Sequence, residues 1–264
     1  MKLAILLTGT IRPFVKNGSF SVDERMKMYT STLQYYADTI GKQYPIVFVE
    51  NSDVSLSFWS KLFENKLDLE VLQFCSKKSF ASEGFDKEKG KGYNEFLMIK
   101  KGVQASEKLK NCTHFLKITG RYSMLNIRKI IKEIEDRADD KLFFADIKDT
   151  KIYQLIGRKN TDSGRWADSR YFVAEIAFYK NQMLDFYQQM DDIKGRNAES
   201  CLFDLYEANK DNERFLFRYR NQVQFDGQCG LVTSHYHERY NSPKAKLKNK
   251  VRGLLRKLFP NIWF

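Results

Sequence analysis

The first third of the chain alternates short apolar runs with segments of helical periodicity. Leu3–Leu7 and Pro45–Val49 are continuous apolar runs, as expected of strands buried on both faces of a parallel sheet, and Leu69–Phe74 is expected as a third strand. Between them, residues 21–40 begin with a capping-box signature and continue at helical spacing, and Ser57–Phe63 predicts a shorter helix. Strands that alternate with helices in this way predict a parallel sheet with crossover helices.

The alternation continues to about residue 150 and then becomes less regular. We expect further elements as follows: helices at Tyr93–Leu109, Asn126–Arg137, Asn181–Met190 and Asn197–Ala208, and strands at His114–Ile118, Leu142–Ala145, Tyr171–Tyr179 and Phe215–Phe225. There is no internal repeat. Residues 1–240 are therefore predicted to form one α/β domain with a mainly parallel sheet flanked by helices.

The end of the chain, residues 241–264, has a different pattern. One face of a predicted helix is apolar, and it consists of Leu247, Val251, Leu254, Leu255 and Leu258. Basic residues fill much of the remaining surface, and there are no acidic residues. We expect this tail to lie in the headgroup region of an anionic membrane; the alternative is a helix packed on the body.

The charge distribution bears on the class of partner. The chain carries 45 basic and 33 acidic residues, a net charge of +12, but seven of the basic residues lie in the tail, which leaves the body at only +5. This weakens the interpretation as a basic nucleic-acid-binding module, for which Phe215–Tyr219 offers a fragment of interleaved aromatic and basic residues. No segment reaches the roughly 20 apolar residues of a membrane span. We expect a cytoplasmic protein, peripheral on the inner face of the cytoplasmic membrane.

Four polar clusters each directly follow a predicted strand: Thr8–Arg12, Glu50–Ser52, Lys117–Tyr122 and Asp146–Asp149. In open parallel sheets, ligands bind beyond the carboxyl ends of the strands. The first cluster has neither G-x-G-x-x-G nor a P-loop, which argues against a dinucleotide or P-loop site. Its glycine permits close approach of a ligand, and Arg12 is suited to a phosphate; the alternative is a tight turn with a surface arginine.

The cluster Lys117–Tyr122 places two cations, Lys117 and Arg121, and a glycine, Gly120, where the fourth strand ends. Two positive groups there would neutralise a diphosphate without a metal; the alternative is a buried cation paired with a carboxylate. Asp146 and Asp149 are spaced to ligate Mg²⁺ or Mn²⁺, although an ordinary solvated turn has the same composition.

Glu199 lies near the start of a predicted helix that Asn197 can cap. A carboxylate held at a helix start can act as general base towards a sugar hydroxyl, and the helix dipole keeps it ionised. An acidic residue in a first helical turn is equally an ordinary structural feature. Asp168, which precedes a predicted strand, is the second candidate.

The order of elements resembles the GT-A glycosyltransferase fold, over roughly residues 2–240. The segment Gly90–Glu95, the helix after it and the segment His114–Tyr122 take the place of that fold's glycine-rich turn, helix and acidic D-x-D motif. The string K-I-T-G-R-Y is similar to one in bacterial capsule and lipopolysaccharide glycosyltransferases.

The resemblance implies a hexosyltransferase-like enzyme that uses a nucleotide-sugar donor and a lipopolysaccharide, O-antigen or capsule acceptor, lipid-linked or oligosaccharide. It implies that Glu199, with Asp168 second, activates the acceptor. It further implies that the nucleotide is contacted by Thr8, Gly9, Arg12 and Glu50, and that the donor is reached across a loop by Lys91 and Asn94.

The departure from the family lies at Gly120 and Arg121, which stand where metal-binding aspartates are expected. We therefore expect a metal-independent enzyme in which Lys117 and Arg121 replace the cation, with Asp146 and Asp149 as the alternative metal ligands. The competing functions are a nucleic-acid-binding module and a non-catalytic scaffold attached to a membrane.

Overall fold

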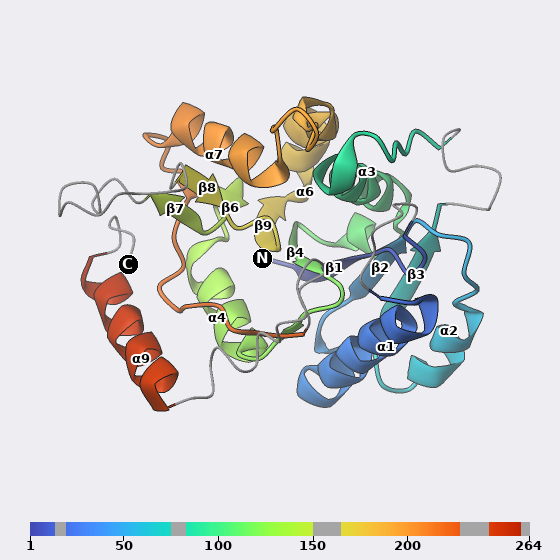
Figure 1. Cartoon of the computed structure of the whole chain (residues 1–264). Coiled ribbons are helices and arrows are strands. Elements are labelled where there is room, and N and C mark those ends of the chain that lie inside the picture. Colours follow the sequence, from blue (N-terminus) through green and yellow to red (C-terminus); the bar gives the residue numbers. More distant parts are fainter. Residues whose placement is uncertain (14–19, 75–82, 150–164, 228–242, 260–264) are drawn as a thin grey trace.

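The structure, a computed structural model, describes residues 1–13, 20–74, 83–149, 165–227 and 243–259. In this part of the chain, seven strands form a central sheet in the order β10-β6-β9-β4-β1-β2-β3 (Figure 1). Their bounds, in that order, are Phe215–Leu216, Phe143–Phe144, Tyr171–Glu175, His114–Thr119, Leu3–Gly9, Ile46–Glu50 and Leu69–Gln73.

The central sheet is mainly parallel. β1 pairs in parallel with β2 and β4, β2 with β3, and β10 with β6, whereas β9 runs antiparallel to both β4 and β6. Two small antiparallel pairs lie outside it: β5 (Ser123–Met124) with β11 (Phe225–Asp226), and β7 (Ile147–Asp149) with β8 (Arg165–Ala167). The predicted α/β fold with a mainly parallel sheet is confirmed.

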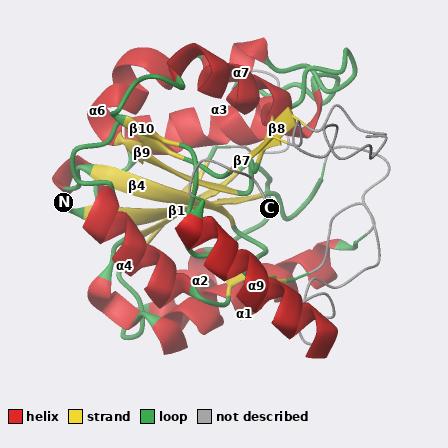
Figure 2. Ribbon diagram, turned by 90° about the vertical axis from the view of Figure 1, so that its left-hand side faces the viewer, coloured by secondary structure: helices red, strands yellow, loops and turns green. Residues whose placement is uncertain are grey.

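Helices cover both faces of the sheet, which gives three layers (Figure 2). Alternate residues of β1 point to opposite faces, so Leu3, Ile5 and Leu7 pack into one core while Ala4 and Leu6 pack into the other. The first core is covered by α1 (Val22–Thr39), α2 (Ser57–Phe63) and α4 (Ile127–Arg137), and the second by α3 (Gly90–Ala105), α6 (Ile176–Phe178) and α7 (Ala198–Asn209).

The start of α1 confirms the capping box. The Ser21 hydroxyl accepts a hydrogen bond from the Glu24 backbone N–H (3.2 Å), and the Glu24 carboxylate accepts one from the Ser21 N–H (2.7 Å). The helix predicted at Ser57–Phe63 is confirmed as α2, and the first four strands, β1 to β4, begin and end within two residues of their predicted bounds.

Three predictions for the second half are wrong. The strand expected over Tyr171–Tyr179 ends at Glu175, where the chain turns into α6. The helix expected over Asn181–Met190 is a π-helical turn followed by a 3₁₀ segment. The strand expected over Phe215–Phe225 is two short strands, β10 and β11, in different sheets. Here tertiary packing of aromatic side chains, and no local period, decides which residues are buried.

The last described element is α9 (Pro243–Leu258), which lies on the outside of the fold (Figure 1). Arg256 attaches it to the body, because its guanidinium donates two hydrogen bonds to the Asp146 carboxylate, at 3.1 and 2.9 Å. None of the helices that the structure describes is both long enough and apolar enough to cross a bilayer.

The packing of α3 on the sheet generates the first prediction. A Cβ atom added at Gly102 would lie 2.6 Å from Cγ2 of Val49, whereas one added at Gly253 of α9 would meet nothing within 4 Å. Overpacking costs about 1–3 kcal/mol, more than the roughly 1 kcal/mol that alanine gains over glycine in a helix. Gly102→Ala is therefore expected to lower the free energy of urea unfolding, while the control Gly253→Ala does not. Equal effects would contradict the packing.

Candidate functional site

Polar side chains gather where β1, β2 and β4 end and β9 begins, which we call the carboxyl edge. The parallel register pairs Thr8 with Thr119 and Gly9 with Glu50 at this edge. β9 runs the opposite way, so the segment before it, Asp168–Arg170, returns to the same place, and the Thr119 N–H donates to the Arg170 carbonyl (2.8 Å). Ligands of α/β sheets bind beyond this edge.

The centre of the carboxyl edge is a buried ion pair. Nζ of Lys117, whose side chain is 0% exposed, lies 2.7 Å from Oε1 of Glu95. The amine also donates to the Thr119 hydroxyl (3.1 Å) and to the Ser169 carbonyl (2.7 Å). The same Glu95 oxygen accepts from the hydroxyls of Thr8 (2.6 Å) and Thr119 (2.9 Å). Four elements, β1, α3, β4 and the start of β9, are thus joined at one point.

Burial and pairing act on this pair in opposite directions. Burial raises the pKa of Glu95, but Lys117 and the two hydroxyls outweigh it and hold that pKa below its ordinary value. Burial lowers the pKa of Lys117, and attraction to Glu95 offsets this only in part. Lys117, predicted to face a diphosphate, is thus engaged with Glu95 beneath the surface.

Glu199 is connected to this pair through Ser169. The Ser169 hydroxyl donates to Oε1 of Glu199 (2.7 Å), while its carbonyl holds Lys117. Glu199 is half-buried in the first turn of α7, whose predicted cap is confirmed, since the Asn197 side chain accepts from the Ser200 N–H (2.8 Å). The structure therefore places this carboxylate at the carboxyl edge.

Asp168, the residue before Ser169, is engaged with a guanidinium. Nε of Arg170 donates to its carboxylate (2.8 Å), Nη2 of Arg170 forms an ion pair with it, and the Asp168 side chain is only 10% exposed. Arg170 in turn lies over the ring of Phe225, 4.9 Å from its centroid. Of the two predicted bases, Glu199 is the one without a paired cation among the described ion pairs.

Glu50 is fully buried and holds the loop that follows β1. Its carboxylate accepts from the N–H groups of Ile11 (3.0 Å) and Ser52 (2.9 Å) and from the Gln73 amide (3.3 Å). Burial raises the pKa of Glu50, against the lowering effect of these bonds. Arg12, at the end of this loop, forms an ion pair with Asp53 and keeps 42% of its side chain exposed. Arg12 is therefore accessible to a ligand, whereas the buried Glu50 contacts only the loop and its neighbours and holds the loop in place.

The two glycines of the predicted site are required by packing. A Cβ atom at Gly9 would lie 2.5 Å from the ring of Phe48. One at Gly120 would lie 2.8 Å from the carbonyl oxygen of Thr8, which accepts the Gly120 N–H at 2.7 Å. These contacts bring β4 and the following turn against β1, which positions Arg121.

Arg121 is half-buried directly after this turn. Its Nη2 donates to the Tyr122 hydroxyl (2.8 Å), and its guanidinium lies over the ring of Tyr122, 4.6 Å from the centroid. Its Nε is buried and makes no hydrogen bond within the described chain. Among the described residues, no carboxylate forms an ion pair with Arg121. Among the described residues, the Nε donor of this guanidinium is therefore left without an acceptor.

Lys91 and Asn94 lie at the start of α3. The Asn94 amide donates to the carbonyls of Asp86 and Gly90, both at 2.6 Å. The backbone N–H of Lys91 donates to the carboxylate of Asp192 (2.6 Å). Helix N-termini attract anions, so the Asp192 carboxylate occupies the place that a ligand phosphate would take. Asn94 is thus engaged in holding the loop before α3.

Of the two carboxylates considered for a metal, the structure describes the side chain of Asp146 alone. Asp146 is saturated by Arg256 and by the Tyr171 hydroxyl (3.1 Å). Asp149 ends β7, and its side chain lies outside the described part of the structure. Across the residues with described positions, no group of three or more His, Cys, Asp or Glu side chains is placed to hold a metal ion.

In the fragment Phe215–Tyr219, which suggested nucleic-acid stacking, the first and last rings are buried and Phe217 is half-buried. Phe215 is 7% exposed and Tyr219 0%, so neither ring is available to a base. A non-catalytic scaffold would be favoured if Glu199 and Asp168 were remote from the carboxyl edge. Both carboxylates instead lie close enough to Lys117 to interact with its charge.

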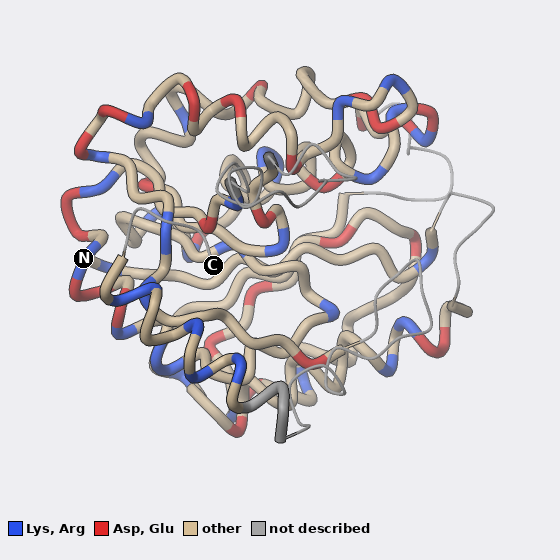
Figure 3. The backbone as a smooth tube through the Cα atoms, turned by 60° about the vertical axis from the view of Figure 1, so that its left-hand side comes forward, with Lys and Arg blue, Asp and Glu red and all other residues tan. Residues whose placement is uncertain are grey.

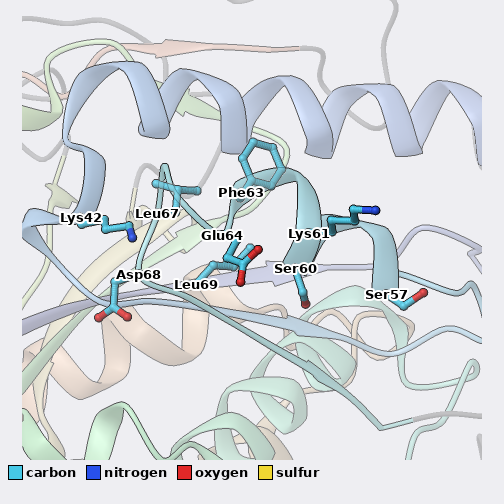
Figure 4. Close-up of a pocket in the computed structure, with 9 residues that line it drawn as sticks. All are labelled: Lys42, Ser57, Ser60, Lys61, Phe63, Glu64, Leu67, Asp68 and Leu69. Atoms are coloured by element: carbon cyan, nitrogen blue, oxygen red, sulfur yellow. The ribbon is translucent and has the colours of Figure 1, made fainter.

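A surface cavity of about 660 Å³ lies elsewhere, between α2 and the start of β3 (Figure 4). Its lining mixes lysines with acids and includes Lys42, Lys61, Glu64 and Asp68. Leu69, the first residue of β3, also lines it, so the cavity is at the amino end of that strand. It does not belong to the carboxyl edge.

Sequence reasoning missed Glu95 and Ser169. Glu95 falls at helical spacing with the buried Ile99 and Gly102. An acidic residue on the apolar face of a predicted helix was therefore a signal in the sequence that Glu95 is buried. Ser169 carried no signal, because its two contacts lie 52 and 30 residues away in the chain.

No protein-family model matches this chain, and no curated protein matches its sequence. Solved structures that resemble it include mouse xyloside xylosyltransferase 1, with 11% identity, coverage of 82% of this chain and 85% of that one, and a TM-score of 0.44. The galactosyltransferase LgtC, in complex with donor and acceptor sugar analogs, has 9% identity, coverage of 84% and 74%, and a TM-score of 0.48.

A third structure, 4-diphosphocytidyl-2C-methyl-D-erythritol synthase from Anaerococcus prevotii, has 11% identity, coverage of 95% of each chain and a TM-score of 0.45. Identities this low concern the fold alone.

The ion pair at the carboxyl edge generates the second prediction. Lys117→Met leaves the Glu95 charge without its amine, and breaking a buried pair costs about 3–5 kcal/mol. Adding Glu95→Gln removes that charge while keeping an oxygen for the Thr8 and Thr119 hydroxyls. The double variant is therefore expected to unfold at higher urea concentration than Lys117→Met alone. Simple addition of the two single costs would show that the residues are not coupled.

The lowered pKa of Glu95 generates the third prediction. Stability that depends on the charged carboxylate is present above the ordinary pKa of 4.5 and is lost as the pH falls through the lower folded value. Glu95→Gln is expected to cost about 3 kcal/mol at neutral pH, and the gap to the native protein narrows in acid. Urea titrations across pH measure this, with Glu207→Gln on α7 as the exposed control. A gap that is constant down to pH 3 would contradict it.

Proposed function

We propose that this protein transfers a sugar from a nucleotide-sugar donor to a cell-surface glycan acceptor, as in lipopolysaccharide, O-antigen or capsule synthesis. One arrangement carries the proposal: Glu199, held by Ser169, and Arg121, whose Nε has no acceptor among the described residues, both interact electrostatically with the Glu95–Lys117 pair at the carboxyl edge. Sugar transfer needs a base for the acceptor hydroxyl and a cation for the leaving diphosphate.

The donor is proposed to bind with its diphosphate towards Arg121 and Arg12. Both guanidinium groups follow strand ends, Arg121 after β4 and Arg12 after β1, and these strands are adjacent. Arg12 is 42% exposed, and its loop is fixed by the bonds to Glu50. The nucleoside is proposed to lie along this loop, where the fixed backbone offers a rigid surface. Planar guanidinium groups match phosphate oxygens with paired hydrogen bonds.

The reaction proposed is a displacement at the anomeric carbon. Glu199 takes the proton of an acceptor hydroxyl, the hydroxyl oxygen bonds to the anomeric carbon, and the bond from that carbon to the phosphate oxygen breaks. The electron pair leaves with the nucleoside diphosphate, whose charge Arg121 and Arg12 stabilise. Ser169 keeps the Glu199 carboxylate oriented through the bond at 2.7 Å.

The proposed reaction uses no metal ion. The support is the chemistry of the donor set: Asp146 is saturated by Arg256 and Tyr171, and Asp168 is engaged with Arg170. The acceptor class rests on the resemblance of the string K-I-T-G-R-Y, and the cytoplasmic, membrane-peripheral location on the basic tail.

The fourth prediction tests this function. The full chain is incubated with UDP-, GDP- and CMP-sugars, with and without EDTA, and nucleotide release is measured. We expect turnover of one donor class that EDTA leaves unchanged, and a loss in kcat of about 10²–10⁴ for Glu199→Gln, the effect of removing a general base. Donor affinity is expected to stay at the native value, since Glu199 faces the acceptor.

The matched control is Glu207→Gln on the same helix, where the side chain is 37% exposed. It is expected to retain native turnover. Absence of both turnover and binding with every donor would overturn the proposed function. Native activity in Glu199→Gln would overturn the role of Glu199, and loss of activity with EDTA would overturn the metal-free reaction.

A further inference from the structure

α9 presents an apolar stripe to solvent. Its members are among the most exposed large apolar residues described, with exposed fractions of 65% for Leu247, 49% for Val251, 58% for Leu254 and 61% for Leu258. Phe259, directly after the helix, is 45% exposed. A contiguous exposed stripe of this kind marks an interaction surface, whereas scattered single residues would not.

The stripe lies opposite the face by which α9 is attached. At about 100° per residue, the four apolar positions fall within roughly 60° of arc, centred about 170° away from Arg256. Lys250 and Lys257 flank the stripe on one side, and Lys248 flanks it on the other. The apolar side chains therefore point outward, with lysine amines on both sides.

The attachment itself is a buried, bidentate ion pair. Side chains of Arg256 and Asp146 are 6% and 10% exposed, and the guanidinium also donates to the Tyr219 carbonyl (3.1 Å). Asp146 in turn accepts from the hydroxyl of Tyr171, the first residue of β9. Asp168–Arg170 directly precedes that residue. The helix is thus connected to the carboxyl edge through two residues.

We propose that α9 is an in-plane membrane anchor that binds an anionic lipid bilayer through its apolar stripe and flanking lysines. Charge complementarity selects this occupant. Residues 243–264 contain basic but no acidic side chains, and Figure 3 shows the blue bands of Lys and Arg along this helix. A second copy of the chain would bring the same positive charges to the contact. Anionic headgroups neutralise them while the acyl region takes up the stripe.

The ion pair gives the anchor a defined orientation. Because Arg256 and the stripe lie on opposite sides of α9, the helix in the bilayer surface holds Asp146 on its cytosolic side. The carboxyl edge is then kept at a fixed height and angle above the lipid. This inference goes beyond sugar transfer, since it requires no donor or acceptor.

The fifth prediction uses the full chain without any sugar nucleotide. Sedimentation with vesicles of phosphatidylcholine alone is compared with vesicles that contain about 30% phosphatidylglycerol, a lipid of the required charge. Binding is expected only to the anionic vesicles, and it weakens as salt rises. Replacing Lys250 and Lys257 by Gln is expected to lower the partition coefficient about 30-fold, and Leu254→Asp with Leu258→Asp at least as much.

The matched control is Phe58→Asp with Leu62→Asp on α2, where the two apolar residues are 46% and 44% exposed. These variants are expected to bind vesicles like the native chain. All of the substituted residues are exposed or at the surface, so circular dichroism is expected to show native folding. Absence of binding to anionic vesicles would overturn the proposal. So would a dimer that Leu254→Asp with Leu258→Asp converts to monomer, because a second copy would then cover the stripe.

Discussion

The ion pair between Lys117 and Glu95 is the constraint on which the carboxyl edge depends. Removing two charges from water is costly, and such a pair persists only where further hydrogen bonds satisfy both groups. Here the hydroxyls of Thr8 and Thr119 and the carbonyl of Ser169 supply them. Since these groups come from β1, β4 and the start of β9, the pair fixes the relative positions of three strands. Ser169 in turn positions Glu199, because its hydroxyl donates a hydrogen bond to the Glu199 carboxylate.

Most other charged groups near this edge are committed to structure. Asp192 neutralises the start of α3, and Asp146 holds α9. Asp168 is engaged with Arg170. Each of these carboxylates lowers the cost of a local positive charge or of a helix N-terminus. Within the described residues, few charged groups at the edge are therefore without a paired charge. The Glu199 carboxylate and the Arg121 guanidinium are two of them.

The sequence predicted the parts of this arrangement that local pattern controls. Apolar runs located β1, β2 and β4, the capping box located the start of α1, and polar clusters at strand ends located the carboxyl edge. Long-range pairs were beyond such reasoning: Asp146 and Arg256 are 110 residues apart, and the N–H of Lys91 finds Asp192 101 residues away. Irregular segments after Glu175 were also missed, because there burial follows tertiary contacts and no fixed period.

The distribution of buried and exposed side chains on α9 is the reverse of that on a helix packed against a hydrophobic core. Such a helix buries its apolar face and exposes its charges, whereas α9 buries Arg256 and exposes Leu247, Val251, Leu254 and Leu258. A buried arginine requires a built partner, and Asp146 provides it with bidentate geometry. Attachment through the Arg256–Asp146 pair leaves the apolar stripe outward, at a cost in exposed apolar surface. The ion pair that attaches the helix therefore also aims its apolar stripe away from the body.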